Sequence, residues 1–349
     1  MNNKLIALAV AGALTAPMMA AEAAPTVYGR MAVEFAQTSN SAAATTDKDY
    51  MVDNKAGQFG FKGSEDLGGG LKAIYKMEFG IETTEDASSN GLFGRETMIG
   101  LKIGKTSTIM MGSLKSPYKY AGGVKYDSFA ATTLQAREGS TNVGGSGGGM
   151  SGGALGHGGF LTNSIAYIGK FKPVTVALAT NALDTATDDA TVSSISVAAK
   201  VKSFHFGVAN ITRDTCTTSA TSNCAGTTAG QDSTKLFGSW SSGQHTVRLQ
   251  VEGVDYETSA GVANGTADFT YLNYQFKMGK HLVDVAIGEK DEDAVAGDDD
   301  EDWTRLAYAY NFSKKTRVFA GIAESDSVDA GAPAKNDWDT FSIGMQVKF

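Results

Sequence analysis

The sequence predicts an all-β chain whose sixteen antiparallel strands close into an up-and-down transmembrane β-barrel. Three observations predict this fold. Apolar and polar side chains alternate with a period of two in segment after segment, and tight turns alternate with long polar segments between them. Beyond the N-terminus no stretch reaches the roughly 18 consecutive apolar residues of a spanning helix, whereas a barrel strand needs only about 9–11 residues.

The composition fits such a chain and excludes several others. Of 349 residues, 38 are acidic and 30 basic, which gives a net charge of −8 and argues against a nucleic-acid-binding protein. There are 42 glycines and 5 prolines. Each glycine inside a helix costs about 1 kcal/mol, so a helical bundle is disfavoured, and collagen would need far more proline.

The N-terminus predicts a signal peptide over residues 1–23. Lys4 supplies the basic start, Leu5 to Ala16 form an apolar core, and Ala21-Glu22-Ala23 is a small-residue cleavage site. The apolar core is too short for a membrane anchor. Residues 24–349 then form the barrel.

The period-two pattern is clearest at 71–82 and 339–349. In the first of these segments, all residues of one parity are apolar, and in the second the alternation runs to the last residue. Alternate positions of one face are Leu71, Ala73, Tyr75, Met77, Phe79, Ile81, and later Phe341, Ile343, Met345, Val347, Phe349. Sixteen such strands would bury more apolar surface than a packed interior could use, so we assign this face to lipid.

Connection lengths give the strand number. Seven short turns and eight long polar segments separate sixteen strands, and strict alternation is expected when strands run up and down through a bilayer. The predicted strands are 27–37, 56–65, 71–82, 94–103, 107–114, 162–171, 174–182, 191–201, 204–213, 234–241, 245–257, 267–278, 281–290, 302–312, 316–325 and 339–349.

Particular residues carry a family resemblance. Residues 59–73 read FGFKGSEDLGGGLKA, residues 95–101 read RETMIGL, residues 163–167 read NSIAY, and the chain ends on Phe349. The chain resembles the general trimeric porins of Gram-negative outer membranes, especially those of beta-proteobacteria and Neisseria. The resemblance implies a sixteen-stranded barrel, a homotrimer among outer-membrane lipids and lipopolysaccharide, and passive diffusion of small hydrophilic solutes and ions without a cofactor. It also implies that the barrel assembly machinery reads Phe349.

The longest polar segment, 115–161, corresponds to the third loop of that family, which folds into the barrel and narrows it. By motif, Arg30, Lys62 and Arg95 fall at wall positions that are often basic, and Asp127 and Glu138 are candidate acids of the loop. Charges of opposite sign facing each other in a narrow throat bias ion traffic. Each of the five could equally be a solvated surface charge.

Departures from the family pattern bear on selectivity. The family often has Arg where this chain has Gln58, Ser113 and Thr162. Three fewer bases on the wall predict a weak cation preference.

Two features lie in the long polar segments. Segment 291–302 holds eight acids and no base, which fits a solvated loop better than a Ca²⁺ site, because the spacing differs from an EF-hand loop. Cys216 and Cys224 lie in one polar segment of an exported chain, so a local disulfide is expected, with no further Cys or nearby His for a metal.

Other functions stay open at this stage. A solute-specific channel would share the architecture, and a surface adhesin or anchor would use the loops alone. An outer-membrane enzyme is not expected, because the four histidines, at positions 157, 205, 245 and 281, are scattered along the chain. The Gly-rich stretch 144–159 lacks the Lys-Ser/Thr of a phosphate-binding loop.

Overall fold

The computed structural model describes the chain from residue 24 onward, apart from several connecting segments. The described residues are 24–40, 49–53, 57–81, 84, 92–122, 125–136, 160–181, 191–215, 230–258, 263–294, 297–329 and 337–349. The predicted signal peptide, Glu138, Cys216 and Cys224 lie outside them, so those expectations stay predictions.

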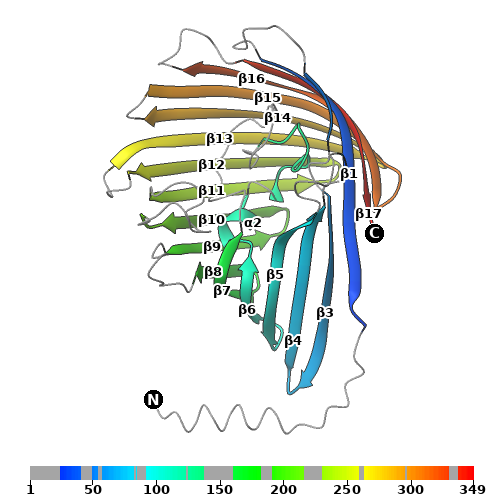
Figure 1. Cartoon of the computed structure of the whole chain (residues 1–349), viewed down its shortest axis with the longest axis vertical. Coiled ribbons are helices and arrows are strands. Elements are labelled where there is room, and N and C mark those ends of the chain that lie inside the picture. Colours follow the sequence, from blue (N-terminus) through cyan, green and yellow to red (C-terminus); the bar gives the residue numbers. More distant parts are fainter. Residues whose placement is uncertain are drawn as a thin grey trace.

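The described residues form one antiparallel sheet. Figure 1 shows strands β10 to β16 side by side along one side of the barrel. The strands are β1 (Thr26–Asn40), β2 (Asp49–Asp53), β3 (Gln58–Gly68), β4 (Leu71–Ile81), β5 (Leu92–Ile103), β6 (Ser107–Leu114), β7 (Leu161–Phe171), β8 (Val174–Asn181), β9 (Val192–Val201), β10 (Phe204–Arg213), β11 (Gln231–Ser242), β12 (His245–Glu257), β13 (Ala263–Met278), β14 (His281–Ala294), β15 (Gly297–Asn311), β16 (Thr316–Asp329) and β17 (Trp338–Lys348).

Strands β2 and β3 are two parts of one barrel strand. Both pair with β1, β2 opposite Glu34 to Thr38 and β3 opposite Thr26 to Arg30. The barrel therefore has sixteen strands, as predicted. It closes where β1 pairs with β17, with Arg30 opposite Lys348. Backbone hydrogen bonds between Gly29 and Phe349, with N···O distances of 3.2 and 3.1 Å, complete the closure at the end where β1 begins and the chain ends. Closure leaves no unpaired strand edge in hydrocarbon.

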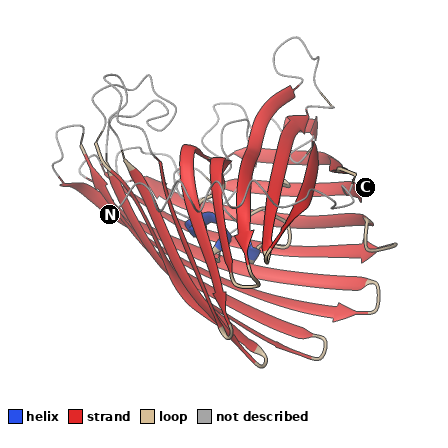
Figure 2. Cartoon of the chain, turned by 90° about the horizontal axis from the view of Figure 1, so that it is seen from below, coloured by secondary structure: helices blue, strands red, loops and turns tan. Residues whose placement is uncertain are grey.

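The short turns lie together at one end of the strands (Figure 2). Tight antiparallel turns need a residue with positive φ, and glycine supplies it at Gly243 and Gly279, where φ is 58° and 60°. The first strand begins and the last strand ends at this same end, as an even number of strands requires. We refer to it as the short-turn end, which in barrels of this class faces the periplasm.

The two faces of the wall differ as the alternation predicts. On β17, Phe341 and Ile343 are 42% and 50% exposed on the outer face, whereas Ser342 and Gln346 are buried on the lumen side. Large apolar side chains exposed on every strand would be costly in water and are stable against lipid.

The acidic segment 291–302 is mainly strand, so the sequence prediction of a loop there was wrong. Strands β14 and β15 continue past their apolar part and pair up to Asp293 opposite Asp298. The prediction stopped too early because it relied on apolar alternation, which ends where a strand leaves the hydrocarbon. Backbone pairing continues beyond that level with polar side chains.

Residues 115–136, which begin the third long connection, pack against the lumen face. They include helix α2 (Pro117–Tyr120), which is capped by Ser116 Oγ accepting from the Lys119 N–H at 3.0 Å. The helix lies within the barrel in Figure 2, and the Tyr118 N–H donates to Ser194 Oγ of β9 at 3.1 Å. The buried apolar core therefore lies between this loop and the wall. No described helix is long and apolar enough to cross a membrane.

Candidate functional site in the barrel lumen

The lumen contains two charged regions that contact the third loop on different sides. We call the first the basic wall, comprising Lys62, Lys76, Glu78, Arg95, Glu96, Lys115 and Lys119. We call the second the loop anchor, comprising Asp127, Tyr271, Asn273, Gln275, Asp284 and Arg305. Strand register brings each set together from several strands, because residues of the same parity on paired strands share one face.

The basic wall is a network of ion pairs on β4, β5 and the start of the third loop. The carboxylate of Glu78 lies 2.9 Å from Lys76 Nζ and accepts from Arg95 Nε at 3.0 Å. Lys115 Nζ bridges the two acids, 3.9 Å from Glu78 and 3.6 Å from Glu96. A bulge between β4 and β5 brings Arg95 next to Glu78, which strict pairing would not do.

Aromatic rings share the basic wall with its cations. The Phe160 ring centroid lies 4.8 Å from Lys119 Nζ and 5.3 Å from the Arg95 guanidinium. Lys62 Nζ lies 4.9 Å from the centroid of Tyr28, whose hydroxyl donates to Glu78 at 2.9 Å. Cations held over ring faces keep their charge while being partly shielded from solvent.

Burial changes the acid–base behaviour of the loop lysine in this network. Desolvation lowers the pKa of the Lys115 ammonium below its ordinary value, and the nearby carboxylates of Glu96 and Glu78 oppose this shift. Five cations and two acids belong to the basic wall, so its formal charge is +5 − 2 = +3.

The loop anchor is closed and buried. Arg305 Nη1 donates to Asp127 Oδ1 at 2.8 Å and to the Leu134 carbonyl at 2.7 Å, while Nη2 donates to Asp284 Oδ1 at 2.7 Å. Asp127 also accepts from the backbone N–H groups of Phe129 and Ala136, at 2.9 and 2.8 Å. Both carboxylate oxygens of Asp127 therefore accept hydrogen bonds inside the fold.

Neighbouring amides complete the anchor on the wall side. Asn273 Nδ2 donates to Asp284 Oδ1 at 2.9 Å, and Gln275 Nε2 donates to Asp284 Oδ2 at 2.7 Å. Gln275 also donates to Ser128 of the loop, and Arg317 Nη1 donates to the Ser128 carbonyl at 3.1 Å. A buried arginine with two carboxylates is stable only when its remaining donors are satisfied in this way.

A second latch, formed by Glu34, Thr133 and Ser342, holds the loop on β1 and β17, next to the side of the barrel that carries the loop anchor. The buried Glu34 of β1 accepts from the Thr133 N–H at 3.0 Å and from the Thr133 hydroxyl at 2.8 Å. The same carboxylate accepts from the Ser342 hydroxyl of β17 at 2.6 Å. Glu34 therefore joins the loop to the strands that close the barrel.

A third contact lies beside the loop on β10. The Tyr126 hydroxyl lies 3.2 Å from His205 Nδ1, and Lys125 Nζ lies 3.5 Å from His205 Nε2. Since an ammonium only donates, Nε2 accepts and Nδ1 carries the proton. Burial raises the pKa of Tyr126 to about 12, so its hydroxyl stays protonated.

The structure places the predicted constriction residues in different environments. Arg95 and Lys62 belong to the basic wall, and Arg30 Nη2 donates to Gln58 Oε1 at 3.4 Å, next to that wall. Asp127 lies in the loop anchor and pairs with Arg305. The terminal Phe349 packs across Gly29, where an added Cβ would lie 2.2 Å from the ring. Their roles in conduction and assembly stay predictions.

Several residues of the site have no motif in the sequence. Arg305, Asp284 and Glu34 hold the loop, and Lys76 and Lys115 supply cations of the basic wall. One signal was available for the strand residues among them, since each is charged and has lumen parity. Lumen parity shows that such a residue faces the interior of the barrel, but it does not show which residue it pairs with.

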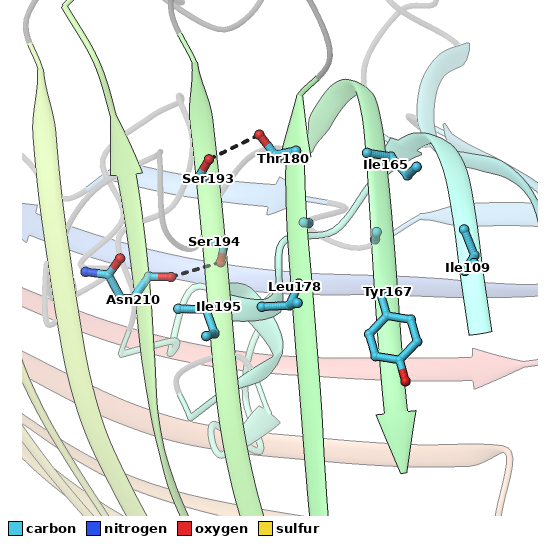
Figure 3. A pocket seen from close by; sticks show the side chains of 11 residues that line it. Ile109, Ile165, Tyr167, Leu178, Thr180, Ser193, Ser194, Ile195 and Asn210 are labelled. Carbon is cyan, nitrogen blue, oxygen red and sulfur yellow. Dashed lines mark hydrogen bonds between the residues drawn. The ribbon is translucent and has the colours of Figure 1, made fainter. Parts of the chain in front are cut away.

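Two further features lie outside this site. On the outer wall, a groove of about 490 Å³ crosses β7 to β9, lined by Ile165, Leu178 and Ile195, with a hydrogen bond between Thr180 and Ser193 (Figure 3). It faces lipid. Among the described residues, no three His, Cys, Asp or Glu side chains are grouped to hold a metal ion.

Comparison with known proteins decides the family. A model of the Gram-negative porins matches residues 7–330. The chain belongs to the Gram-negative porin family. This porin is 37% identical over 128 residues to a major outer membrane protein P.IB of Neisseria gonorrhoeae, which is 35% of this chain and 34% of that one. It is 33% identical over 129 residues to P.IB of Neisseria meningitidis serogroup B, 36% and 37% of the two chains.

Solved structures confirm the fold. An anion-selective porin from Comamonas acidovorans has a TM-score of 0.73 at 18% identity, covering 93% of this chain and 99% of that one. OmpT of Vibrio cholerae, in a trimer form, has a TM-score of 0.70 at 14% identity, covering 94% and 100%. The sequence matches span about a third of the P.IB relatives. Family and barrel together place this porin in the outer membrane.

Proposed function

We propose that this porin forms a water-filled channel for passive diffusion of small hydrophilic solutes and ions. The observation that carries the proposal is the position of residues 115–136, which contact opposite walls of the lumen. The Tyr118 N–H donates to Ser194 of β9, and Thr133 donates to Glu34 of β1. A loop that is fixed across a barrel narrows the lumen and still leaves it open to water. Family and fold indicate a channel rather than an enzyme.

For selectivity we propose a weak anion preference. Missing arginines at Gln58, Ser113 and Thr162 predict the opposite sign, a weak cation preference. The lumen argues against that expectation, because the basic wall has a formal charge of +3 and the acid of the loop, Asp127, is buried and paired with Arg305. A structural neighbour described as anion-selective is consistent with this sign.

Planar-bilayer recording of the refolded protein tests both statements. We expect discrete conductance steps, and a reversal potential in a KCl gradient that has the sign of chloride selectivity. Absence of steps from folded protein would exclude the channel, whereas a potassium-selective reversal potential would restore the cation preference. Conductance that saturates with one solute would favour a solute-specific channel.

Deletion of residues 120–159 separates the channel from an adhesin or anchor. The deletion removes the loop contacts of Asp127 and Thr133, so a channel should conduct more current per step. An adhesin or anchor would show no change in conductance. Sheet content and heat-modifiable electrophoretic mobility of the variant verify that the barrel still forms.

We also propose a homotrimer in contact with outer-membrane lipids and lipopolysaccharide, assembled by recognition of Phe349. The trimer form of a structural neighbour supports the first part. Conductance steps in groups of three would agree with it, and a monomeric mass in detergent would contradict it. Phe349→Ala should lower the yield of assembled barrel in cells.

A further inference from the structure

Charge is distributed unevenly along the barrel axis. At the short-turn end, five lysines have lumen parity, and we call them the mouth lysines: Lys72, Lys102, Lys170, Lys200 and Lys348. Four of them are exposed, and the Lys72 side chain is 43% exposed. Their parity follows from the register. Lys72 lies four residues from Lys76, Lys170 four from the buried Ala166 and Lys348 two from the buried Gln346. Lys102 pairs with Lys72, and Lys200 pairs with His205, which contacts the loop.

The register places like charges opposite each other at this mouth. Lys72 pairs with Lys102 across β4 and β5, and Arg30 pairs with Lys348 across β1 and β17. Like charges directly opposite each other destabilise a sheet. Among the described ion pairs, the acid next to a mouth lysine is Asp66, 4.0 Å from Lys72. The short-turn mouth is therefore strongly positive.

The opposite end of the barrel is negative. On the outer face, Glu289, Asp302 and Asp326 form a directly paired row across β14, β15 and β16, and all three are exposed. The other seven acids of segment 291–302 extend this negative charge to the β14–β15 hairpin, where Asp293 lies opposite Asp298. We call this end the acidic end. Along the axis the charge thus changes sign from one mouth to the other.

We propose that this axial charge separation makes the pore rectify, so that it passes more current when the short-turn side is at negative potential. The inference rests on the proposed channel function. With that polarity, anions enriched at the mouth lysines move into the pore, and cations enriched at the acidic end move in from the other side. Both ions accumulate in the lumen. With the opposite polarity both are drawn out, and the lumen is depleted.

Salt concentration decides the size of the effect. The Debye length is about 10 Å at 0.1 M salt and about 3 Å at 1 M. At the lower concentration the charges of each mouth act across the lumen, and at the higher one they are screened. We therefore expect a current ratio between the two polarities of roughly 1.5 at 0.1 M that falls close to 1 at 1 M.

Single-channel current–voltage curves in symmetric KCl test the proposal. The key variant is Lys72→Gln/Lys102→Gln/Lys348→Gln, which neutralises three mouth lysines and should bring the ratio at 0.1 M close to 1. The matched control is Lys105→Gln/Lys172→Gln/Lys314→Gln, which removes the same charge from exposed turn tips. The control should keep most of the rectification. Succinic anhydride added to one compartment identifies the short-turn side of each inserted channel.

The outcomes separate this inference from the channel function. Discrete steps with a linear current–voltage curve at 0.1 M would overturn rectification and leave the channel intact. No steps from folded protein would remove the channel itself. Equal loss of rectification in the two triple variants would show that net charge, and not the mouth lysines, is responsible. Rectification of opposite polarity would also overturn the proposal.

Discussion

The basic wall and the loop anchor contain the same types of charged residue, but these residues have different roles in the two regions. In the loop anchor, the side chains of Arg305, Asp127 and Asp284 are at most 2% exposed, and the two carboxylates share the Arg305 guanidinium. In the basic wall, Arg95, Lys76 and Lys115 remain 16–24% exposed and outnumber their acids. Because the charges of the loop anchor are buried, they hold the loop in place. The charges of the basic wall are accessible to water and can therefore act on ions.

The comparison also explains why Asp127 is not a free acid of the throat. Its carboxylate accepts from Arg305 and from two backbone N–H groups, so little of its charge reaches the lumen. A charge that is fully paired in a dry site contributes to structure, and its field outside the pair is weak. The selectivity of this porin then depends on the region where pairing is incomplete.

The largest effect is expected from Arg305→Met. It leaves Asp127 and Asp284 buried without their cation, which typically costs about 3–5 kcal/mol of unfolding free energy. Urea unfolding in detergent should show the loss, and the released loop should raise single-channel conductance. Adding Asp127→Asn and Asp284→Asn to Arg305→Met should recover part of the stability. Unchanged unfolding in the single variant would show that the anchor is not buried as described.

The second latch is expected to matter less for folding and more for loop motion. Glu34→Ala removes the acceptor of Thr133 and Ser342, and a hydrogen bond to a charged group contributes about 1.5–3 kcal/mol. We expect added open-channel noise from a loosened loop. Glu34→Gln keeps an acceptor oxygen and should be quieter than Glu34→Ala. Equal noise in the two variants and in the parent would argue against a latch.

The basic wall should change selectivity with little change in stability. Arg95→Gln/Lys115→Gln lowers the formal charge of the wall from +3 to +1, while Lys76 still pairs with Glu78. The reversal potential in a KCl gradient should shift toward potassium, and the unfolding free energy should fall by no more than about 1 kcal/mol, because these pairs are partly exposed. Lys202→Gln/Lys280→Gln removes the same charge from turn tips and should leave the reversal potential nearly unchanged.

The smallest effect is expected on the outer wall. Asp302 lies between Glu289 and Asp326, so Asp302→Asn relieves two like-charge contacts. Such cross-strand pairs are each worth about 0.2–1 kcal/mol, and the variant should be slightly more stable in urea. At 1 M salt, where surface charge is screened, its single-channel conductance should equal that of the parent. A clear loss of stability would point to an unrecognised partner of Asp302.

The sequence by itself determined the barrel, its strand number and which face of each strand meets lipid. These properties follow from a local period of two and from turn lengths, which each segment carries independently of the others. The resemblance to the porins also identified residues 115–161 as the loop that folds into the barrel. The sequence placed the starts of β13 and β15 too late, since apolar alternation stops at the membrane boundary and backbone pairing does not.

Only the tertiary structure decided which charges face each other. Arg305 and Asp127 are 178 residues apart, and Glu34 and Ser342 are 308 residues apart. A charged residue of lumen parity is visible in the sequence, but its partner depends on barrel closure and on the path of the third loop through the interior. Whether a charge is paired or left to act on ions therefore depends on the closed barrel, because pairing and burial are properties of neighbours in space.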